Sequence, residues 1–164
     1  MKKIILFAAA VFMSVYCMAQ EPMAFPFQGG KEVMTKFFKD SVVVSNEIVS
    51  KKATGMVVFK FTADQKGAIK KMVIYYADDV MLARPVIEAL KKSSSKWIVP
   101  GNEKSHDFIL PFIIGFNPSA SNTADTKNLY YNFYLAKKPI QTQDQLPLDV
   151  VTMLPPVMIN YDVN

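Results

Sequence analysis

The sequence predicts an α+β domain, in which two helices pack on one face of a small antiparallel sheet of about three strands, followed by a C-terminal extension. Three observations predict this fold class. Residues 56–62 and 69–76 alternate apolar and polar side chains on either side of a turn, which is typical of a β-hairpin. Residues 108–116 alternate in the same way and predict a third strand. Segments 31–39 and 82–90 place apolar residues at helical spacing.

The chain opens with the three parts of a secretory signal. Lys2 and Lys3 form a positive head, and residues 4–15 are almost entirely apolar. Small residues then stand at the −3 and −1 positions of a cut between Ala19 and Gln20. We therefore expect residues 1–19 to be removed on export.

Two other interpretations of this segment remain open. It is shorter than the ~20 apolar residues of a membrane-spanning helix, but it would still serve as an uncut anchor. Alternatively, Cys17 would be lipidated, although Tyr16 stands where lipoprotein signals resemble one another in having a small residue. Cleavage after Ala19 would leave no cysteine, and hence no disulfide framework and no cysteine-based metal site.

The predicted domain covers residues 20–116 and begins with a lead-in rich in Pro, Gly and Phe up to residue 30. In the first helix, at 31–39, the apolar residues gather on one face. In the hairpin, Val57, Phe59 and Phe61 share one face of a half-buried strand, and Gly67 closes the turn.

Asp78 or Asp79 is positioned to cap a second helix. Because proline is disfavoured inside a helix, we expect the regular part to begin near Arg84, with Pro85 at an early position. The serines at 93–95 are expected to end this helix.

The third strand places its large apolar residues on one face and contains a proline. Pro111 has no N–H to donate to a ladder, so we expect this strand at an edge of the sheet, or with the proline position facing outward. An edge strand is a template for pairing with another chain. The predicted partner-binding surface is therefore this strand, with Phe108, Leu110, Pro111, Phe112 and Ile114.

Residues 117–164 change in character. Residues 117–127 have the composition of a linker, residues 129–135 are aromatic, and two apolar runs follow, separated by Pro155 and Pro156. We expect a linker and an extension that either adds one or two strands or remains a disordered arm. The aromatic residues at 130–134 are compatible with an adhesive patch or with strand positions.

Enzymatic residues are scarce, so we expect no catalytic site, no metal site and no cofactor. His106 is the only histidine, and its neighbour Asp107 would point to the opposite face of a strand. Asp78 and Asp79 are better explained as a helix cap than as paired catalytic carboxylates. Aromatic residues at 97, 108, 112 and 116 fit a core better than a ligand cage.

The formal net charge of +5 is mild, and the lysine pairs are scattered along the chain. They form no single basic stripe of the kind that nucleic-acid binding requires. A weak attraction to an anionic membrane, and hence peripheral membrane association, remains open.

Several features, taken in order, resemble the C-terminal domain of the TonB family. They are Phe25-Pro26 with Gly29-Gly30, the strand from Gly55 with its Asp64…Gly67 turn, the helix ending near Leu90, Lys96-Trp97 with Pro100, and Leu110-Pro111-Phe112 ending in Phe116. The resemblance covers about residues 25–116. It implies two helices on one face of a short antiparallel sheet, and capture of an extended segment of an outer-membrane receptor by strand addition.

The chain departs from an energy-transducing TonB protein in its cleavable N-terminus, its lack of a long Pro/Lys-rich spacer and its C-terminal tail. We therefore expect a periplasmic, outer-membrane-associated or secreted module of a Gram-negative envelope that binds a protein, such as an outer-membrane receptor or envelope complex. Two alternatives stay open: a transducer component with an uncut anchor, and a structural envelope protein that self-associates, for example as a homodimer through a sheet edge or the tail. Within the tail, Asp149, Val150, Val151 and Thr152 loosely resemble the segments that TonB-like domains capture, which suggests that the tail docks on the domain's own edge.

Overall fold

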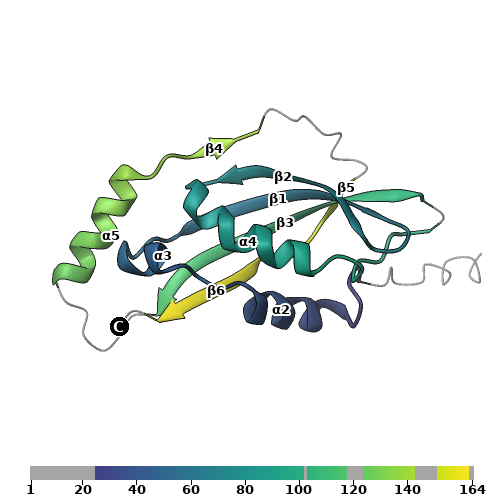
Figure 1. The fold of residues 1–164 in the computed structure, drawn as a ribbon, viewed down its shortest axis with the longest axis horizontal. Coiled ribbons are helices and arrows are strands. Elements are labelled where there is room, and N and C mark those ends of the chain that lie inside the picture. The colour runs from purple at the N-terminus through teal and green to yellow at the C-terminus, as the bar shows by residue number, and fades with distance from the viewer. Residues whose placement is uncertain (1–24, 102, 118–123, 143–150, 163–164) are drawn as a thin grey trace, which may run out of the picture.

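The computed structural model describes residues 25–101, 103–117, 124–142 and 151–162, which form an α+β fold with a mixed sheet (Figure 1). The predicted α+β class is confirmed, although the described residues form six strands where about three were expected. The helices are α2 (Gly30–Ser41), α3 (Asn46–Ser50), α4 (Val80–Lys92) and α5 (Ala124–Ala136). The strands are β1 (Gly55–Asp64), β2 (Ile69–Ala77), β3 (Ser105–Asn117), β4 (Ile140–Gln141), β5 (Val151–Met153) and β6 (Val157–Asp162).

The sheet has the order β4-β2-β1-β3-β5, with β6 also paired to β3. The strands β1, β2 and β3 pair antiparallel, as do β2 and β4, whereas β5 and β6 run parallel to β3. Helices α2 and α4 lie on the same face of the sheet (Figure 1). This face therefore carries the core.

The β1–β2 hairpin is confirmed, and its turn depends on a glycine. The Asp64 carboxylate accepts hydrogen bonds from the backbone N–H groups of Lys66 and Ala68, both at 2.9 Å. Gly67 has a φ of 73°, and a Cβ at this position would stand 2.3 Å from the backbone oxygen of Trp97. The turn thus packs directly against the chain that follows α4, and only glycine fits there.

The apolar face of the sheet is filled by aromatic side chains. Trp97 is 2% exposed, and its ring lies 4.5 Å from Phe61 and 5.0 Å from Phe27, centroid to centroid. Its indole N–H donates to the buried Ser93 hydroxyl at 3.0 Å, which satisfies the one polar group of the ring. Phe38 of α2 packs edge-on against Phe112 at 5.1 Å. The interpretation of Trp97 as a core residue is confirmed.

Helix α4 begins earlier than predicted. The Asp79 side chain accepts a hydrogen bond from the Met81 N–H at 2.9 Å and caps a helix that starts at Val80. Pro85 lies inside the helix and is buried. The expectation that regular helix starts near Arg84 was wrong, because the cap and the buried apolar face maintain the helix through the proline. The predicted end is confirmed, with Ser93 as the C-cap.

Of the two expectations for β3, that it is an edge strand or that the Pro111 position faces outward, the first was wrong, whereas the Pro111 backbone does face away from β1. On one side β3 pairs with β1, and on the other it pairs with β5 at residues 107–109 and with β6 at residues 112–117. Pro111 falls between these two ladders. The Leu154 N–H donates to the Ile109 oxygen at 2.8 Å, so the Ile109 backbone groups face the tail, and those of Pro111, two residues on, do the same. The missing N–H of Pro111 costs no hydrogen bond, because β5 pairs with β3 before this position and β6 pairs with β3 after it.

The tail contributes to the core through β6. Val157, Ile159 and Tyr161 alternate with exposed residues and are at most 7% exposed. The Tyr161 hydroxyl donates to the backbone oxygen of Ala53 at 2.8 Å, and burial raises the pKa of this phenol well above its usual range. The described part of the extension therefore contains three strands, β4, β5 and β6, where one or two were expected, and β6 is firmly packed.

The aromatic segment at 129–135 belongs to helix α5, not to a strand. The first four residues of α5, Ala124–Lys127, lie in the stretch that was expected to be a linker. Of its side chains only Phe133 is buried. Tyrosine and phenylalanine are frequent in strands, and the single buried side chain leaves no helical pattern to recognise.

Candidate functional site: an open sheet edge beside an apolar groove

Among the described residues, the outer edge of β2 is paired only at its C-terminal end. Strand β4 pairs only with Tyr76 and Ala77, and the Thr142 N–H reaches the Tyr75 oxygen at 3.2 Å. Among the residues that the structure describes, no strand pairs with the outer side of 69–74. An uncovered strand edge presents unpaired N–H and C=O groups, to which another chain can pair.

The register determines which backbone groups face outward. The Ile109 groups face the tail, so those of Phe108 face β1. Phe61 lies opposite Phe108, and its groups therefore face β3. Met72 lies opposite Phe61 on the other side of β1. Its N–H and C=O consequently point away from β1, toward the open edge, and the same holds two residues on for Ile74 opposite Phe59.

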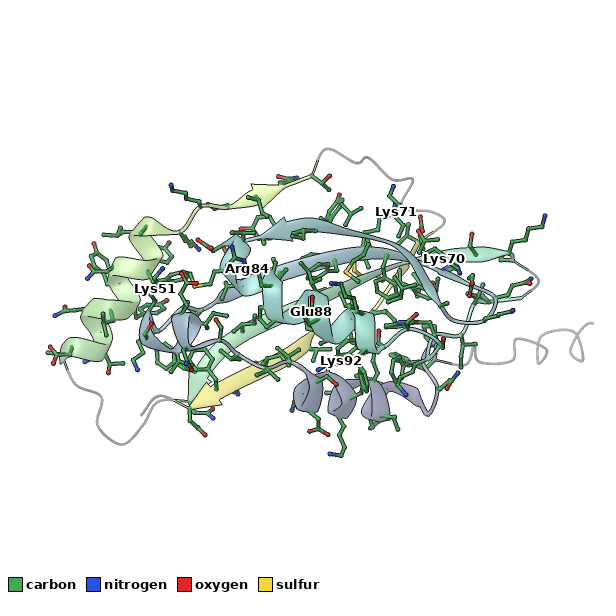
Figure 2. All side chains as sticks on the ribbon, viewed as in Figure 1. Lys51, Lys70, Lys71, Arg84, Glu88 and Lys92 are labelled. Atoms are coloured by element: carbon green, nitrogen blue, oxygen red, sulfur yellow. The ribbon has the colours of Figure 1, made fainter. Side chains whose placement is uncertain are left out.

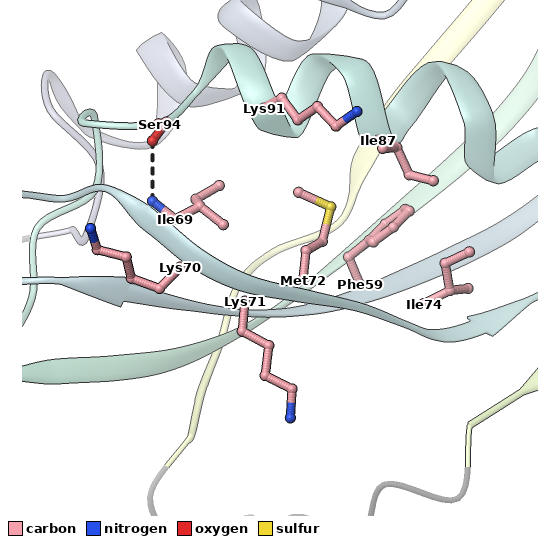
Figure 3. A pocket seen from close by; sticks show the side chains of 9 residues that line it. All are labelled: Phe59, Ile69, Lys70, Lys71, Met72, Ile74, Ile87, Lys91 and Ser94. Atoms are coloured by element: carbon pink, nitrogen blue, oxygen red, sulfur yellow. Dashed lines mark hydrogen bonds between the residues drawn. The ribbon is translucent and has the colours of Figure 1, made fainter.

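A groove of about 680 Å³ runs between this edge and α4 (Figure 3). Apolar side chains from both elements line it, with Met72 directed into the space between β2 and the helix and Ile87 on the helix side. At one end the Ile69 N–H donates to the Ser94 hydroxyl at 3.1 Å. The lining residues are Phe59, Ile69, Lys70, Lys71, Met72, Ile74, Ile87, Lys91 and Ser94.

The charged residues that line the groove are all cationic. Lys70 and Lys91 are both 62% exposed and pair with Asp64 at 3.0 Å and with Glu88 at 2.8 Å. Because both lysine side chains are mostly exposed, solvent screens these pairs and they contribute little free energy, so both ammonium groups remain available to a partner's carboxylates. Lys71 points to the opposite side of the sheet (Figure 3).

Further charged residues flank the groove on the helix. Figure 2 shows Arg84, Glu88 and Lys92 along α4, all of them exposed. Arg84 and Lys92 are two cations on either side of one carboxylate, Glu88. This excess of positive charge favours an acidic partner over a basic one.

The structure places the predicted partner-binding residues elsewhere. The side chains of Phe108, Leu110, Phe112 and Ile114 lie in the core with at most 1% exposure, and Pro111 is half-buried beside the tail. Because β5 and β6 occupy the outer side of β3, this strand offers no free edge in this structure.

Part of the proposed docking segment of the tail is visible. Val151 and Thr152 lie in β5, opposite Asp107 and Phe108 of β3. Asp149 and Val150 lie outside the described residues, as do Ala19 and Gln20 at the expected signal cleavage site.

His106 joins the tail to β3. Its Nδ1 lies 2.7 Å from a Glu103 carboxylate oxygen, and its Nε2 lies 2.7 Å from the Thr152 hydroxyl oxygen. The order of hydroxyl, imidazole and carboxylate is that of a nucleophile, its base and an orienting group. These three residues do not line the groove beside β2, nor do they line a smaller pocket at α5. The His106 ring lies 4.9 Å from the ring of buried Phe108, centroid to centroid. We interpret the arrangement as a structural contact that holds β5 against β3.

Asp107 faces the other side of the sheet, as predicted from strand alternation. It accepts a hydrogen bond from the Thr62 hydroxyl and lies 3.4 Å from the ammonium of Lys60. It therefore does not orient His106.

A second polar cluster lies where α5 meets the hairpin. The Asp78 carboxylate accepts from Lys137 at 2.8 Å, from the Met56 N–H at 2.7 Å and from the Tyr76 hydroxyl at 3.0 Å. Burial raises the Asp78 pKa, but these three hydrogen bonds outweigh it, so the pKa lies below its usual value. The Asp78 hydrogen bond raises the pKa of Lys137.

This cluster borders a pocket of about 260 Å³, which Met81 and Phe133 line together with Lys137. Asp79, the other carboxylate of the pair, caps α4 and also borders this pocket. The cluster ties α5 to the rest of the fold.

Within the described ranges, no group of three or more His, Cys, Asp or Glu side chains is arranged to hold a metal ion. None of the helices in those same ranges is both long and apolar enough to cross a membrane. No family model, no curated protein and no solved structure matches this chain.

Sequence reasoning missed the edge of β2. Residues 69–76 were predicted as a strand, but alternation shows which residues share a face and not which strands are neighbours. The predicted order therefore lacked the tail strands, and the free edge was assigned to β3 when it lies on β2.

Proposed function

We propose that this chain is an exported, non-enzymatic module of the cell envelope that binds another protein by strand addition. The partner's extended segment pairs with the outer edge of β2 and places alternate side chains in the groove between β2 and α4. The observation that carries the proposal is the coincidence of an open strand edge and an apolar groove at residues 69–74.

The two parts of the site divide the work of recognition. Outward backbone groups at Met72 and Ile74 supply hydrogen bonds that do not depend on the partner's sequence. The groove selects apolar side chains at every second position of the partner. Because the charged groove residues are lysines, the partner segment is expected to combine apolar residues with Asp or Glu.

Two further features support a location in the envelope. The N-terminal segment has the pattern of a secretory signal, and the ordered motifs from Phe25 to Phe116 resemble a TonB C-terminal domain. That family captures segments of outer-membrane receptors along a sheet edge, so a protein at the outer membrane is the proposed partner. Because the chain's own tail strands pair with the outer side of β3, we propose the edge of β2 as the one that binds the partner.

Photo-crosslinking in cells tests this proposal. A benzophenone amino acid replaces Lys70 beside the groove, or Lys36 on α2 as the control, whose side chain is 78% exposed. We expect a discrete adduct with one protein from position 70 and none from position 36. Equal adducts from both positions, or none from position 70, would count against the site.

The same sample distinguishes the alternatives. A chain that begins at Gln20 is a free exported module, whereas a chain that keeps residues 1–19 returns the anchored transducer to consideration. An adduct at position 70 with twice the mass of the chain identifies a second copy as the occupant and supports the self-associating structural protein.

A further inference from the structure

Helix α5 exposes more aromatic and aliphatic surface than any other helix described. Tyr131, Tyr134 and Leu135 are 58%, 53% and 64% exposed, and Leu129 and Tyr130 are each about 40% exposed. A single exposed apolar residue needs no explanation, but several on one short helix indicate an interaction surface.

The most exposed residues form one stripe along the helix. Lys127, Tyr131, Tyr134 and Leu135 stand at i, i+4, i+7 and i+8 and so share a face. Phe133, on a different side of the helix, is buried and attaches α5 to the fold. The stripe therefore faces away from the fold, and α5 lies at one end of the sheet with that side uncovered by any described element (Figure 1).

The charges around the stripe have one sign. Lys127 is exposed on it, and Lys138 is exposed just beyond the C-terminal end of the helix. Asp125, in the first turn, is the only acidic residue of α5. The stripe thus combines tyrosine, leucine and lysine and lacks carboxylates.

We propose that the outer stripe of α5 lies on the surface of an anionic phospholipid bilayer. Tyrosine is enriched at the level of lipid headgroups, where its ring is buried and its hydroxyl stays wet. Lysines beside such residues are attracted to anionic headgroups. A single convex helix at the end of the molecule meets a plane without obstruction, which favours a membrane over a partner that would need a groove.

This surface is separate from the groove at β2, which lies on another part of the fold (Figure 1). The inference therefore goes beyond the proposed function and does not depend on it. Together the two sites would hold the module at a membrane with its strand edge free for a protein.

A local fluorescence probe tests the inference in the chain as it is recovered from cells. Position 135 is changed to cysteine in a C17S background and labelled with the environment-sensitive dye NBD. The control carries the dye at position 43, where Val43 is 72% exposed on a different part of the fold. Vesicles of phosphatidylcholine alone, or mixed equally with phosphatidylglycerol, are then added.

We expect a blue shift and a several-fold rise in emission at position 135 with the anionic vesicles, a smaller change with phosphatidylcholine and none at position 43. The changes K127E and K138E, made together, should weaken vesicle binding at least about thirtyfold, as expected when two lysines near an anionic surface are reversed. Unchanged emission at position 135 would overturn the proposal. A shift that follows protein concentration without vesicles would also overturn it, because it would identify a second copy as the occupant.

Discussion

The hydroxyl of Tyr161, near the C-terminal end of the described chain, donates a hydrogen bond to the backbone oxygen of Ala53, 2.8 Å away. This bond joins the last strand to the loop between α3 and β1. Because Val157 and Ile159 of the same strand are buried as well, the tail is a part of the folded domain.

We expect Tyr161→Phe to lower the free energy of unfolding by about 1–2 kcal/mol, since a buried acceptor loses its donor. Urea denaturation measures the change. The control is Tyr131→Phe on exposed α5, which should be neutral. Equal effects of the two substitutions would show that the Tyr161 hydroxyl contributes nothing specific.

Truncation after Thr142 keeps α5 and β4, removes β5 and β6, and bares the outer side of β3. Val157 and Ile159 would no longer cover the core, so we expect a lower thermal midpoint. The freed edge should also promote self-association, visible in mass measurements over a range of concentrations. A truncated chain with the stability and mass of the whole one would contradict the role of the tail.

The pair Asp78–Lys137 predicts how stability depends on pH. The folded pKa of Asp78 is lowered, so its contribution is present above the unfolded value of about 3.8 and is lost as pH falls through the folded pKa. The folded pKa of Lys137 is raised, so its contribution is present below about 10.5 and is lost as pH rises through the folded pKa.

Asp78→Asn should therefore destabilise the protein by about 1.5–3 kcal/mol at pH 7, the range for hydrogen bonds to charged groups. Denaturation at a series of pH values measures the difference. It should shrink below pH 4. A difference that stays constant between pH 7 and pH 2 would show that the carboxylate charge is not involved.

Gly67 and Gly101 offer a matched pair of glycines with positive φ. A Cβ at Gly67 meets the Trp97 oxygen at 2.3 Å, whereas a Cβ at Gly101 meets nothing within 4 Å. Gly101→Ala should cost about 1 kcal/mol from backbone strain alone, and Gly67→Ala should cost about 2 kcal/mol more because the turn must move away. Similar thermal midpoints for both variants would contradict the close approach at Gly67.

The sequence predicted those elements whose residues pack by a regular period. The hairpin and β3 alternate cleanly because helices cover only one face of the sheet, and one of the two aspartates expected to cap α4, Asp79, does so. Helix α5 was missed because Phe133 is its only buried residue, so no helical period is visible.

The order of the strands in the sheet could not be predicted from the sequence for a different reason. Pro111 correctly indicated a backbone position without a ladder partner, but the cause is a gap between two tail strands and not a free edge. The hydrogen bond between His106 and Thr152 joins residues 46 positions apart, and no local sequence pattern predicts such a contact.

Pairing at the β2 edge is the central claim, and the amide of Met72 tests it most directly. Seven-residue peptides rich in Asp, Glu and apolar residues are selected on the protein, and the affinity of the best one is measured for Met72→Pro and Met72→Ala. Both variants lose the groove side chain, but only proline removes the outward N–H, which leaves pairing with β1 intact. With similar thermal midpoints, the account predicts at least about tenfold weaker binding for Met72→Pro than for Met72→Ala, the scale of one lost hydrogen bond. Equal affinities for the two variants would contradict strand addition at this edge.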